Sequence, residues 1–260
     1  MITRAQIAGV ISDFAPLSLQ ESWDNSGVQV GDLAAECSGV LVAVDPTPEV
    51  IAEAVSLGCN MVVSHHPLIF RGLKSLTGAT EVERAVLEAI RSDVAVYSAH
   101  TSLDSTRGGI SWAMARMLGA EVRCVLAPSV PGADTGLGVV AEFPEAIGPD
   151  ELYREVSQTF DSEHPRASLW CEGGVRRIAM CGGSGGEFIG RAIAAGADAY
   201  ITADIRYHDY VDHGREILLL DIGHFESERC AKDIFYGVIT EKFPNFAVYY
   251  SQQQNPIQYL

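Results

Sequence analysis

The sequence has few basic residues. Its 260 residues include 18 lysines and arginines against 34 aspartates and glutamates, which gives a formal net charge of -16. This acidity disfavours non-specific binding to nucleic acid or to an anionic membrane surface. Long apolar runs are also missing, because no stretch approaches the roughly 18 residues that a membrane span requires. The opening MITRAQIAGVISDFAP has one arginine and no long apolar run, so it predicts an amphipathic helix rather than a signal peptide.

No two cysteines have the spacing C-x-x-C, which argues against a zinc ribbon or a thioredoxin-type site. We therefore expect free thiols in a reducing cytoplasm, mostly packed in the core. The six are Cys37, Cys59, Cys124, Cys171, Cys181 and Cys230. Hydrophobic residues make up 47% of the chain, enough for a sizeable core in one large α/β domain or in two lobes.

Short apolar runs alternate with helical patterns, which predicts an α/β fold built from parallel βαβ units. Thr47 is expected to cap one helix and Gly58 to close it. The expected strands are 39–45, 61–64, 94–98, 138–143, 177–180, 199–202, 217–221 and 247–250. The expected helices are 48–57, 80–91, 108–118, 150–160, 187–195 and 226–243.

The segment 127–138, APSVPGADTGLG, is rich in proline and glycine. Such a change in composition is typical of a linker, and it predicts two lobes, 1–127 and 128–260. Both halves use βα units, so the two lobes are expected to be similar.

Polar residues gather at the ends of the expected strands. Ligands of open α/β sheets bind beyond the carboxyl ends of the strands, so these positions are the candidate site. They are His65 and His66 after 61–64, His100 and Asp104 after 94–98, Asp204 and His208 after 199–202, and His224 and Glu228 after 217–221.

The adjacent pair His65 and His66 admits two interpretations. Neighbouring side chains of a strand point to opposite faces, so one histidine could pack in the core while the other meets water. Pro67, however, ends the strand and holds His66 in an extended conformation. Two imidazoles splayed in this way can each bind a different ion of a pair.

His224 and Glu228 are four residues apart and share a face if a helix begins near His224. Alone, Glu228 could be a first-turn acid favoured by the helix dipole and Asp104 an N-cap. Together with His65 and His66 they form a mixed nitrogen and oxygen set that suits Zn, Mn, Fe, Co or Ni. Five ligands exceed the need of one catalytic ion, so the count predicts two ions bridged by Glu228.

Two further motifs are less specific. CGGSGG, 181–186, lies between a strand and a helix, where glycines let backbone N–H groups approach an anion. It does not fit the dinucleotide or P-loop patterns, so it is either weak support for a phosphate-bearing ligand or a tight turn capped by Ser184. ESWDNSGVQVGD, 21–32, either borders a substrate site or is a hairpin-like loop in which Trp23 covers core, and the residues favour the second.

The sequence as a whole resembles the dinuclear-metal-centre proteins catalogued as GTP cyclohydrolase I type 2 homologues. Six motifs occur in the order of that family: WDNSGVQVGD, SHHPLIF, YSAHTSLD, CGGSGG, ITADIRYHDY and IGHFESE. The resemblance runs from about Leu19 to the NPI near the C-terminus and matches the short form of the family. Members often have asparagine at Ser102 and glycine at Ala203, and neither position is a ligand.

The resemblance implies two similar α/β lobes with helix-flanked sheets that face a central metal-binding cleft. It implies six subunits in a ring, a trimer of dimers, and two divalent metal ions per subunit. The metal ligands carry over onto His65, His66, Asp104, His224 and Glu228. This set agrees with the one reached from the strand ends.

We therefore expect a metal-dependent hydrolase of a purine nucleotide, similar to GTP cyclohydrolase. Metal ions bring the pKa of bound water close to neutral, and His100 or His208 could move protons as catalytic residues. Two alternatives stay open. One is a phosphoesterase, although Ser64 stands where the DHH phosphoesterases have a ligand aspartate. The other is a non-enzymatic ring that handles metal or binds partners.

Overall fold

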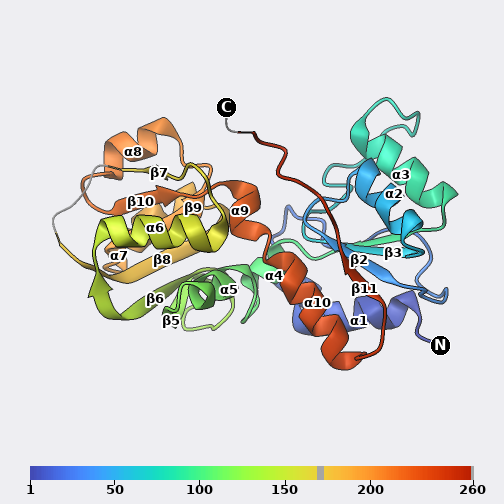
Figure 1. Ribbon diagram of the computed structural model, residues 1–260, viewed down its shortest axis with the longest axis horizontal. Helices are drawn as coiled ribbons and strands as arrows, with labels where there is room; N and C mark the ends of the chain where they lie inside the picture. The colour runs from blue at the N-terminus through green and yellow to red at the C-terminus, as the bar shows by residue number, and fades with distance from the viewer. Residues whose placement is uncertain (169–172, 259–260) are drawn as a thin grey trace. The chain divides into compact units, whose positions relative to one another are not determined.

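A computed structural model describes residues 1–168 and 173–258. The chain forms two compact units (Figure 1). Unit 1 comprises Met1–Thr106 and Ala231–Gln254, and unit 2 comprises Arg107–Cys230 and Asn255–Leu260. Each is a sheet flanked by helices, so the α/β class is confirmed. None of the helices in the described residues is long and apolar enough to cross a membrane.

Unit 1 has a five-stranded sheet in the order β1-β4-β3-β2-β11. Its strands are β1 (Gly27–Val30), β2 (Val40–Ala43), β3 (Met61–Ser64), β4 (Ala95–Ser98) and β11 (Val248–Tyr250). Four strands are parallel, as the βαβ pattern predicted, and β1 pairs with β4 in the antiparallel direction. Strand β11 returns from the far end of the chain to the edge beside β2.

Helices cover both faces of this sheet. They are α1 (Arg4–Phe14), η1 (Leu17–Leu19), α2 (Pro48–Ser56), α3 (Glu81–Arg91), α4 (Thr101–Ser105) and α10 (Ala231–Lys242). Alternate strand residues point to opposite faces, so Leu41 and Val62 pack with Ile51 of α2 in one core cluster. Helices α1 and α10 contact each other, and α10 contacts β2 and β3. The side chain of Thr47 accepts a hydrogen bond from the Val50 backbone N–H, which confirms the predicted cap.

Unit 2 has a six-stranded sheet in the order β5-β6-β8-β9-β10-β7. Its strands are β5 (Glu121–Pro128), β6 (Gly136–Ile147), β7 (Arg166–Ala167), β8 (Val175–Ser184), β9 (Ala199–Ala203) and β10 (Leu218–Asp221). The neighbours β8, β9 and β10 are parallel, and the remaining pairs are antiparallel.

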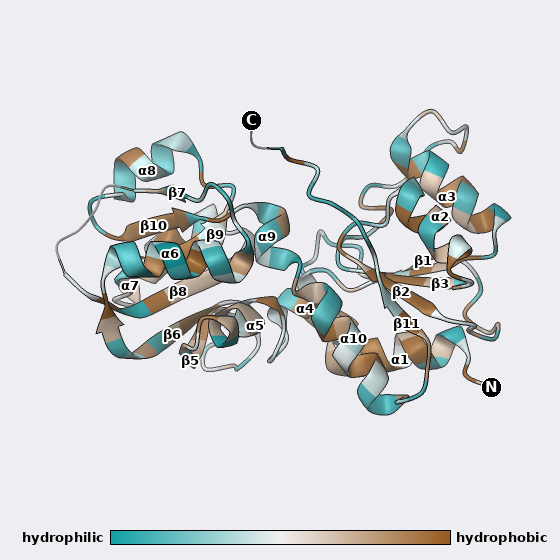
Figure 2. Ribbon diagram, viewed as in Figure 1, coloured by the Kyte–Doolittle hydropathy of each residue, from teal (hydrophilic) through white to brown (hydrophobic). Residues whose placement is uncertain are grey.

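The helices of unit 2 are α5 (Ile110–Met117), α6 (Pro149–Phe160), η2 (Gly186–Phe188), α7 (Ile189–Ala194), α8 (Tyr207–His213) and α9 (His224–Glu228). Ile189 and Ala192 of α7 pack with Tyr200 of β9 and Leu219 of β10. Figure 2 shows the apolar character of β6, β8 and β10 against the mixed polar and apolar surface of α6. Of the cysteines in the described residues, four are buried and Cys124 is exposed; Cys171 lies outside those residues.

The proline- and glycine-rich segment 127–138 joins two paired strands, β5 and β6, within unit 2. The change of unit comes earlier, after Thr106, and the chain returns to unit 1 after Cys230. Gly136 has φ +135, and a Cβ there would lie 2.3 Å from the carbonyl oxygen of Ala127. The prolines and glycines of segment 127–138, which predicted a boundary between lobes, therefore form a tight connection between two strands of one unit.

The predicted long helix 226–243 is wrong. The segment forms two helices, α9 and α10, which are separated by Arg229 and Cys230. The chain passes from unit 2 to unit 1 at this point. Because no glycine or proline lies between the helices, local residue preferences carried no signal for the break. Strands β1, β5 and β7 were also not predicted.

Candidate metal centre

His65 and His66 follow directly after β3. Their rings lie close together, although neighbouring side chains within a strand would point to opposite faces. The His65 N–H donates to the carbonyl of Ala43 at 3.2 Å and the His66 N–H donates to Val44 at 2.9 Å. The two ring centroids are 5.0 Å apart. Because the regular strand ends at Ser64, both imidazoles reach the same region at the carboxyl end of the sheet.

The ring of His65 is fully buried, and its tautomer can be deduced. Its Nδ1 lies 3.0 Å from the carbonyl oxygen of Ala99. A carbonyl can only accept a hydrogen bond, so Nδ1 is the donor and Nε2 is the ring nitrogen left to face another group. Nε2 lies 3.8 Å from Oδ1 of Asp104, which belongs to α4. Two of the predicted ligands in unit 1 therefore face each other.

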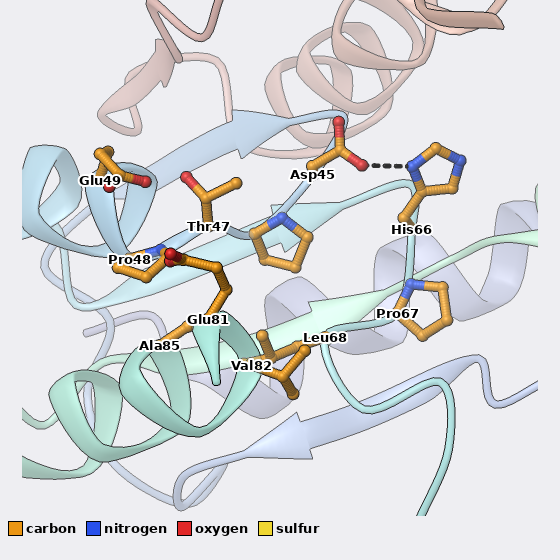
Figure 3. A pocket seen from close by; sticks show the side chains of 11 residues that line it. Asp45, Thr47, Pro48, Glu49, His66, Pro67, Leu68, Glu81, Val82 and Ala85 are labelled. Carbon is orange, nitrogen blue, oxygen red and sulfur yellow. Dashed lines mark hydrogen bonds and ion pairs between the residues drawn. The ribbon is translucent and has the colours of Figure 1, made fainter. Parts of the chain in front are cut away.

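The ring of His66 is held by a carboxylate. Its Nδ1 lies 2.6 Å from Oδ1 of Asp45, the residue that follows the end of β2 by two positions (Figure 3). Asp45 is in turn clamped by Gln253, which accepts from the Asp45 N–H at 3.0 Å and donates to Oδ2 at 2.9 Å. Carboxylates in this position fix the ring of a metal-ligating histidine and make it more basic.

His100 has the same kind of partner. Its Nδ1 lies 2.8 Å from Oδ1 of Asp24, whose side chain is fully buried. Asp24 also accepts hydrogen bonds from the Thr101 N–H at 3.0 Å, the Thr101 hydroxyl at 2.6 Å and the Ser26 hydroxyl at 2.9 Å. Burial alone would raise the pKa of Asp24, but these donors hold it well below its usual range.

The three histidines of unit 1 form one cluster. Their ring centroids lie 5.0 to 5.4 Å apart. One nitrogen from each of His65, His66 and His100 lies within 4.8 Å of the others, which is a spacing that could hold a metal ion. The sequence pattern predicted His100 as a catalytic residue rather than a ligand, and its position now suits either role.

Unit 2 supplies a second group of donors on α9. Nε2 of His224 lies 3.1 Å from Oε2 of Glu228, and its Nδ1 lies 2.6 Å from Oδ2 of Asp204. Helix α9 begins at His224, so the condition under which residues 224 and 228 share a face is met. Glu228 is 3% exposed. Burial lowers the pKa of His224, but hydrogen bonds to Asp204 and Glu228 outweigh it and raise the pKa to about 11.

The three orienting carboxylates were not identified from the sequence as such. Asp45 and Asp204 follow the strands β2 and β9, so the signal that selected the histidines also applied to them. Asp204 has φ +54, an uncommon conformation for a residue other than glycine that often occurs at functional sites. Asp24 lies in the loop before β1 and carried no such signal. The other predicted catalytic residue, His208, is exposed on α8, where its ring contacts Tyr207.

The glycines of CGGSGG make room for the carboxylate of Glu228. Gly183 has φ +63, and a Cβ there would lie 2.2 Å from Oε1 of Glu228. The Gly183 N–H donates to the hydroxyl of Ser227 at 2.9 Å, and the Gly182 N–H donates to Ser111 at 3.3 Å. These two amides already have partners within the protein, so they offer no cradle for phosphate. Ser184 does not cap the following helix, whose first turn has no side-chain cap.

A cavity of about 420 Å³ opens beside His66 and Asp45 in unit 1 (Figure 3). Its lining is largely apolar, with Pro46, Pro67, Leu68 and Val82. Among the described lining residues are also the carboxylates Glu49 and Glu81, and no lysine or arginine. A cavity with these charges favours an uncharged group over a phosphate.

Helix α2 begins beside this cavity. Pro48 has no N–H, and the Val50 N–H donates to the Thr47 hydroxyl, so neither residue offers a free amide to an anion. Among the described residues that line the cavity, His66 is the only nitrogen base.

Comparison with known proteins decides the relationship. The profile of the Duf34/NIF3 (NGG1p interacting factor 3) family matches residues 2–256. The chain belongs to the DUF34/NIF3 family.

Other members of the family have clear sequence similarity. A protein of Clostridium perfringens named GTP cyclohydrolase 1 type 2 homolog is 36% identical over 225 residues, 85% of each chain. A Lactococcus lactis protein of the same name is 34% identical over 254 residues, 94% of each chain. The resemblance found in the six sequence motifs is thereby confirmed.

Solved structures share the fold over the whole chain. A Staphylococcus aureus hypothetical protein has a TM-score of 0.90 at 26% identity, covering 100% of this chain and 99% of its own. A Bacillus cereus protein related to NIF3 has a TM-score of 0.93 at 23% identity, covering 99% of each chain. These likenesses support the two-sheet α/β architecture.

Proposed function

We propose that this DUF34/NIF3 protein binds two divalent metal ions and uses them to hydrolyse a purine nucleotide. The observation that carries the proposal is the pairing of histidines with carboxylates. His66, His100 and His224 each direct Nδ1 to an aspartate at 2.6 to 2.8 Å. Metal-ligating histidines commonly have this arrangement, because it turns the other nitrogen towards the metal.

The donor set fits a transition metal. His65 directs Nε2 towards Asp104, and Asp104 and Glu228 add carboxylates whose side chains are only 14% and 4% exposed. Imidazole with carboxylate suits Zn, Mn, Fe, Co or Ni. Metal affinities within this group follow a general order that does not select one ion, so the identity is left to measurement.

The proposed ligands come from both units. His65, His66 and Asp104 belong to unit 1, and His224 and Glu228 belong to unit 2. The resemblance in sequence supports these five residues as the ones that would hold the two ions. It also supports assembly of six chains into a ring, which is part of the same proposal.

Metal ions in such a site polarise substrate oxygens and lower the pKa of coordinated water. The chain itself contributes a proton acceptor, because His100 keeps its ring oriented through Asp24 and has one nitrogen that faces the cluster. The relatives named GTP cyclohydrolase 1 type 2 homolog support a guanine nucleotide as the substrate class.

The first test is the metal content per chain, measured by elemental analysis after purification and reconstitution. We expect near two ions in the wild type and sharply fewer in His66→Ala and Glu228→Ala. His213→Ala is the matched control, because His213 is a surface residue paired with Glu216. Incubation with GTP should give a metal-dependent product that the two ligand variants lack.

Each result has a distinct meaning. One ion or none, unchanged in the ligand variants, would overturn the dinuclear site. Two ions without turnover of GTP would support the dinuclear site but refute the proposed hydrolysis of a guanine nucleotide.

A further inference from the structure

Two large aromatic side chains beside the histidine cluster are exposed. Trp23 is 58% exposed and Phe70 is 46% exposed. The residues of the loop favoured a core-covering role for Trp23, and the structure does not give it one. Their rings meet edge to face, with centroids 5.9 Å apart and planes at 65°. This arrangement leaves a broad apolar surface in contact with solvent.

Both rings also contact His100. Its ring centroid lies 6.0 Å from Trp23 and 6.1 Å from Phe70, again edge to face at 72° and 79°. His100 is in turn 5.3 Å from His65 and 5.4 Å from His66. The exposed aromatic pair is therefore continuous with the proposed metal ligands and lies within the same unit.

The residues next to Trp23 and Phe70 are held by hydrogen bonds. Asp24, next to Trp23, is fixed by four hydrogen bonds from His100, Thr101 and Ser26. Asn25 donates to the carbonyl of Ile69 at 2.6 Å, directly before Phe70. Gln29 accepts from the Ile69 N–H at 3.1 Å.

Because the chain beside both rings is already held in place, a ligand that binds to them does not have to order these loops.

We infer that Trp23 and Phe70 form a stacking platform for the base of a nucleotide, and that the base rather than the phosphates is brought to the histidines. A planar heteroaromatic ring can stack on the face of Trp23 while its ring nitrogens meet His100. Among the described residues that line the cavity beside His66 there is no lysine or arginine to pair with a phosphate. The inference rests on the proposed function, because it names the part of the substrate that this site would recognise.

The test uses metal-loaded protein and three probes: guanosine, GTP and ribose 5-phosphate. Binding is measured by calorimetry and by quenching of tryptophan fluorescence. Removing a stacking side chain costs about 1 to 3 kcal/mol per base, so Trp23→Ala should weaken guanosine binding roughly 5- to 150-fold. Trp23→Phe should keep most of the affinity.

Two further variants provide a control and a second test. Ile90→Ala removes another exposed apolar side chain of unit 1, which is 57% exposed on α3, and should leave guanosine binding unchanged. Phe70→Ala repeats the test from the other ring if Trp23→Ala fails to fold.

The possible outcomes distinguish a failure of this inference from a failure of the proposed function. A wild-type protein that holds metal but binds ribose 5-phosphate as well as GTP, and guanosine not at all, would overturn the platform alone. Equal guanosine binding in Trp23→Ala and wild type would do the same. A smaller assembly of Trp23→Ala in sedimentation, with guanosine affinity intact, would assign the rings to contact with a second copy. Loss of metal from the wild type would instead refute the proposed function.

Discussion

Replacing Gly183 by alanine tests whether the CGGSGG motif exists to admit the carboxylate of Glu228. Gly183 lies near the end of β8 in a left-handed conformation, with φ +63. Its N–H donates to Ser227 at 2.9 Å, and its carbonyl accepts from the hydroxyl of Thr202 at 3.0 Å. Because both backbone groups are bonded, the peptide cannot rotate into a conformation that suits alanine without breaking one of them.

Two costs add in this variant. An L-residue with a side chain pays roughly 1 to 2 kcal/mol for the left-handed conformation. The new Cβ would also lie 2.2 Å from Oε1 of Glu228 and 3.4 Å from Cε1 of His224. The first distance is far below van der Waals contact, so Glu228 must move. We expect a lower free energy of unfolding and a metal content below that of the wild type.

The measurements are urea denaturation followed by circular dichroism, and elemental analysis of the folded protein. Gly190→Ala is the matched control, because Gly190 lies in α7 and a Cβ there meets nothing within 4 Å. In a helix interior, alanine is favoured over glycine by roughly 0.5 to 1 kcal/mol, so this control should be neutral or more stable. A Gly183→Ala protein with wild-type stability and full metal content would refute the reasoning. Lower stability with full metal content would refute only the link to Glu228.

Two further predictions concern the metal ligands and the response to acid. Gln253→Ala removes the two hydrogen bonds that hold Asp45, the residue that orients His66. Metal affinity, measured by chelator competition, should therefore fall about 10- to 100-fold. Gln254→Ala is the control and should bind metal normally, because its exposed amide donates to the nearby backbone. The pKa of Glu83 is lowered, chiefly by hydrogen bonds from the preceding loop. Its stabilisation is therefore present above the unfolded pKa of about 4.3 and lost as pH falls through the lower folded value. The stability gap between wild type and Glu83→Gln should shrink from pH 7 towards about pH 3, and a constant gap in urea midpoints would contradict this.

Local patterns predicted most of the regular structure. Strand β3 was expected with the bounds that the structure gives, and α2, α3 and α6 lie within a residue or so of their predictions. These segments have a strong apolar period and a clear end signal, such as the cap at Thr47. The predictions that failed concern segments without such signals. The break between α9 and α10 occurs at Arg229 and Cys230, where no residue disfavours helix and only the passage between units demands it.

The candidate site divides in the same way. Histidines at the ends of strands are visible in the sequence, because parallel strands bring their carboxyl ends to one edge of a sheet. The partners that orient them are not visible, since Asp24 lies 76 positions from His100 and Gln253 lies 208 positions from Asp45. No periodicity relates residues at such separations. Their pairing depends on how the loops and the C-terminal strand fold back on unit 1.

The sequence by itself therefore determined the α/β class, the family and the candidates for metal ligands, because these depend on local periodicity and on the chemistry of motifs. Only the tertiary structure decided that His100 lies beside His65 and His66, that the carboxylate of Glu228 lies where a side chain at Gly183 would be, and that Trp23 is exposed beside His100. Each of these facts is a distance between segments that are remote in the chain, and such distances are set by the packing of the whole unit rather than by any one segment.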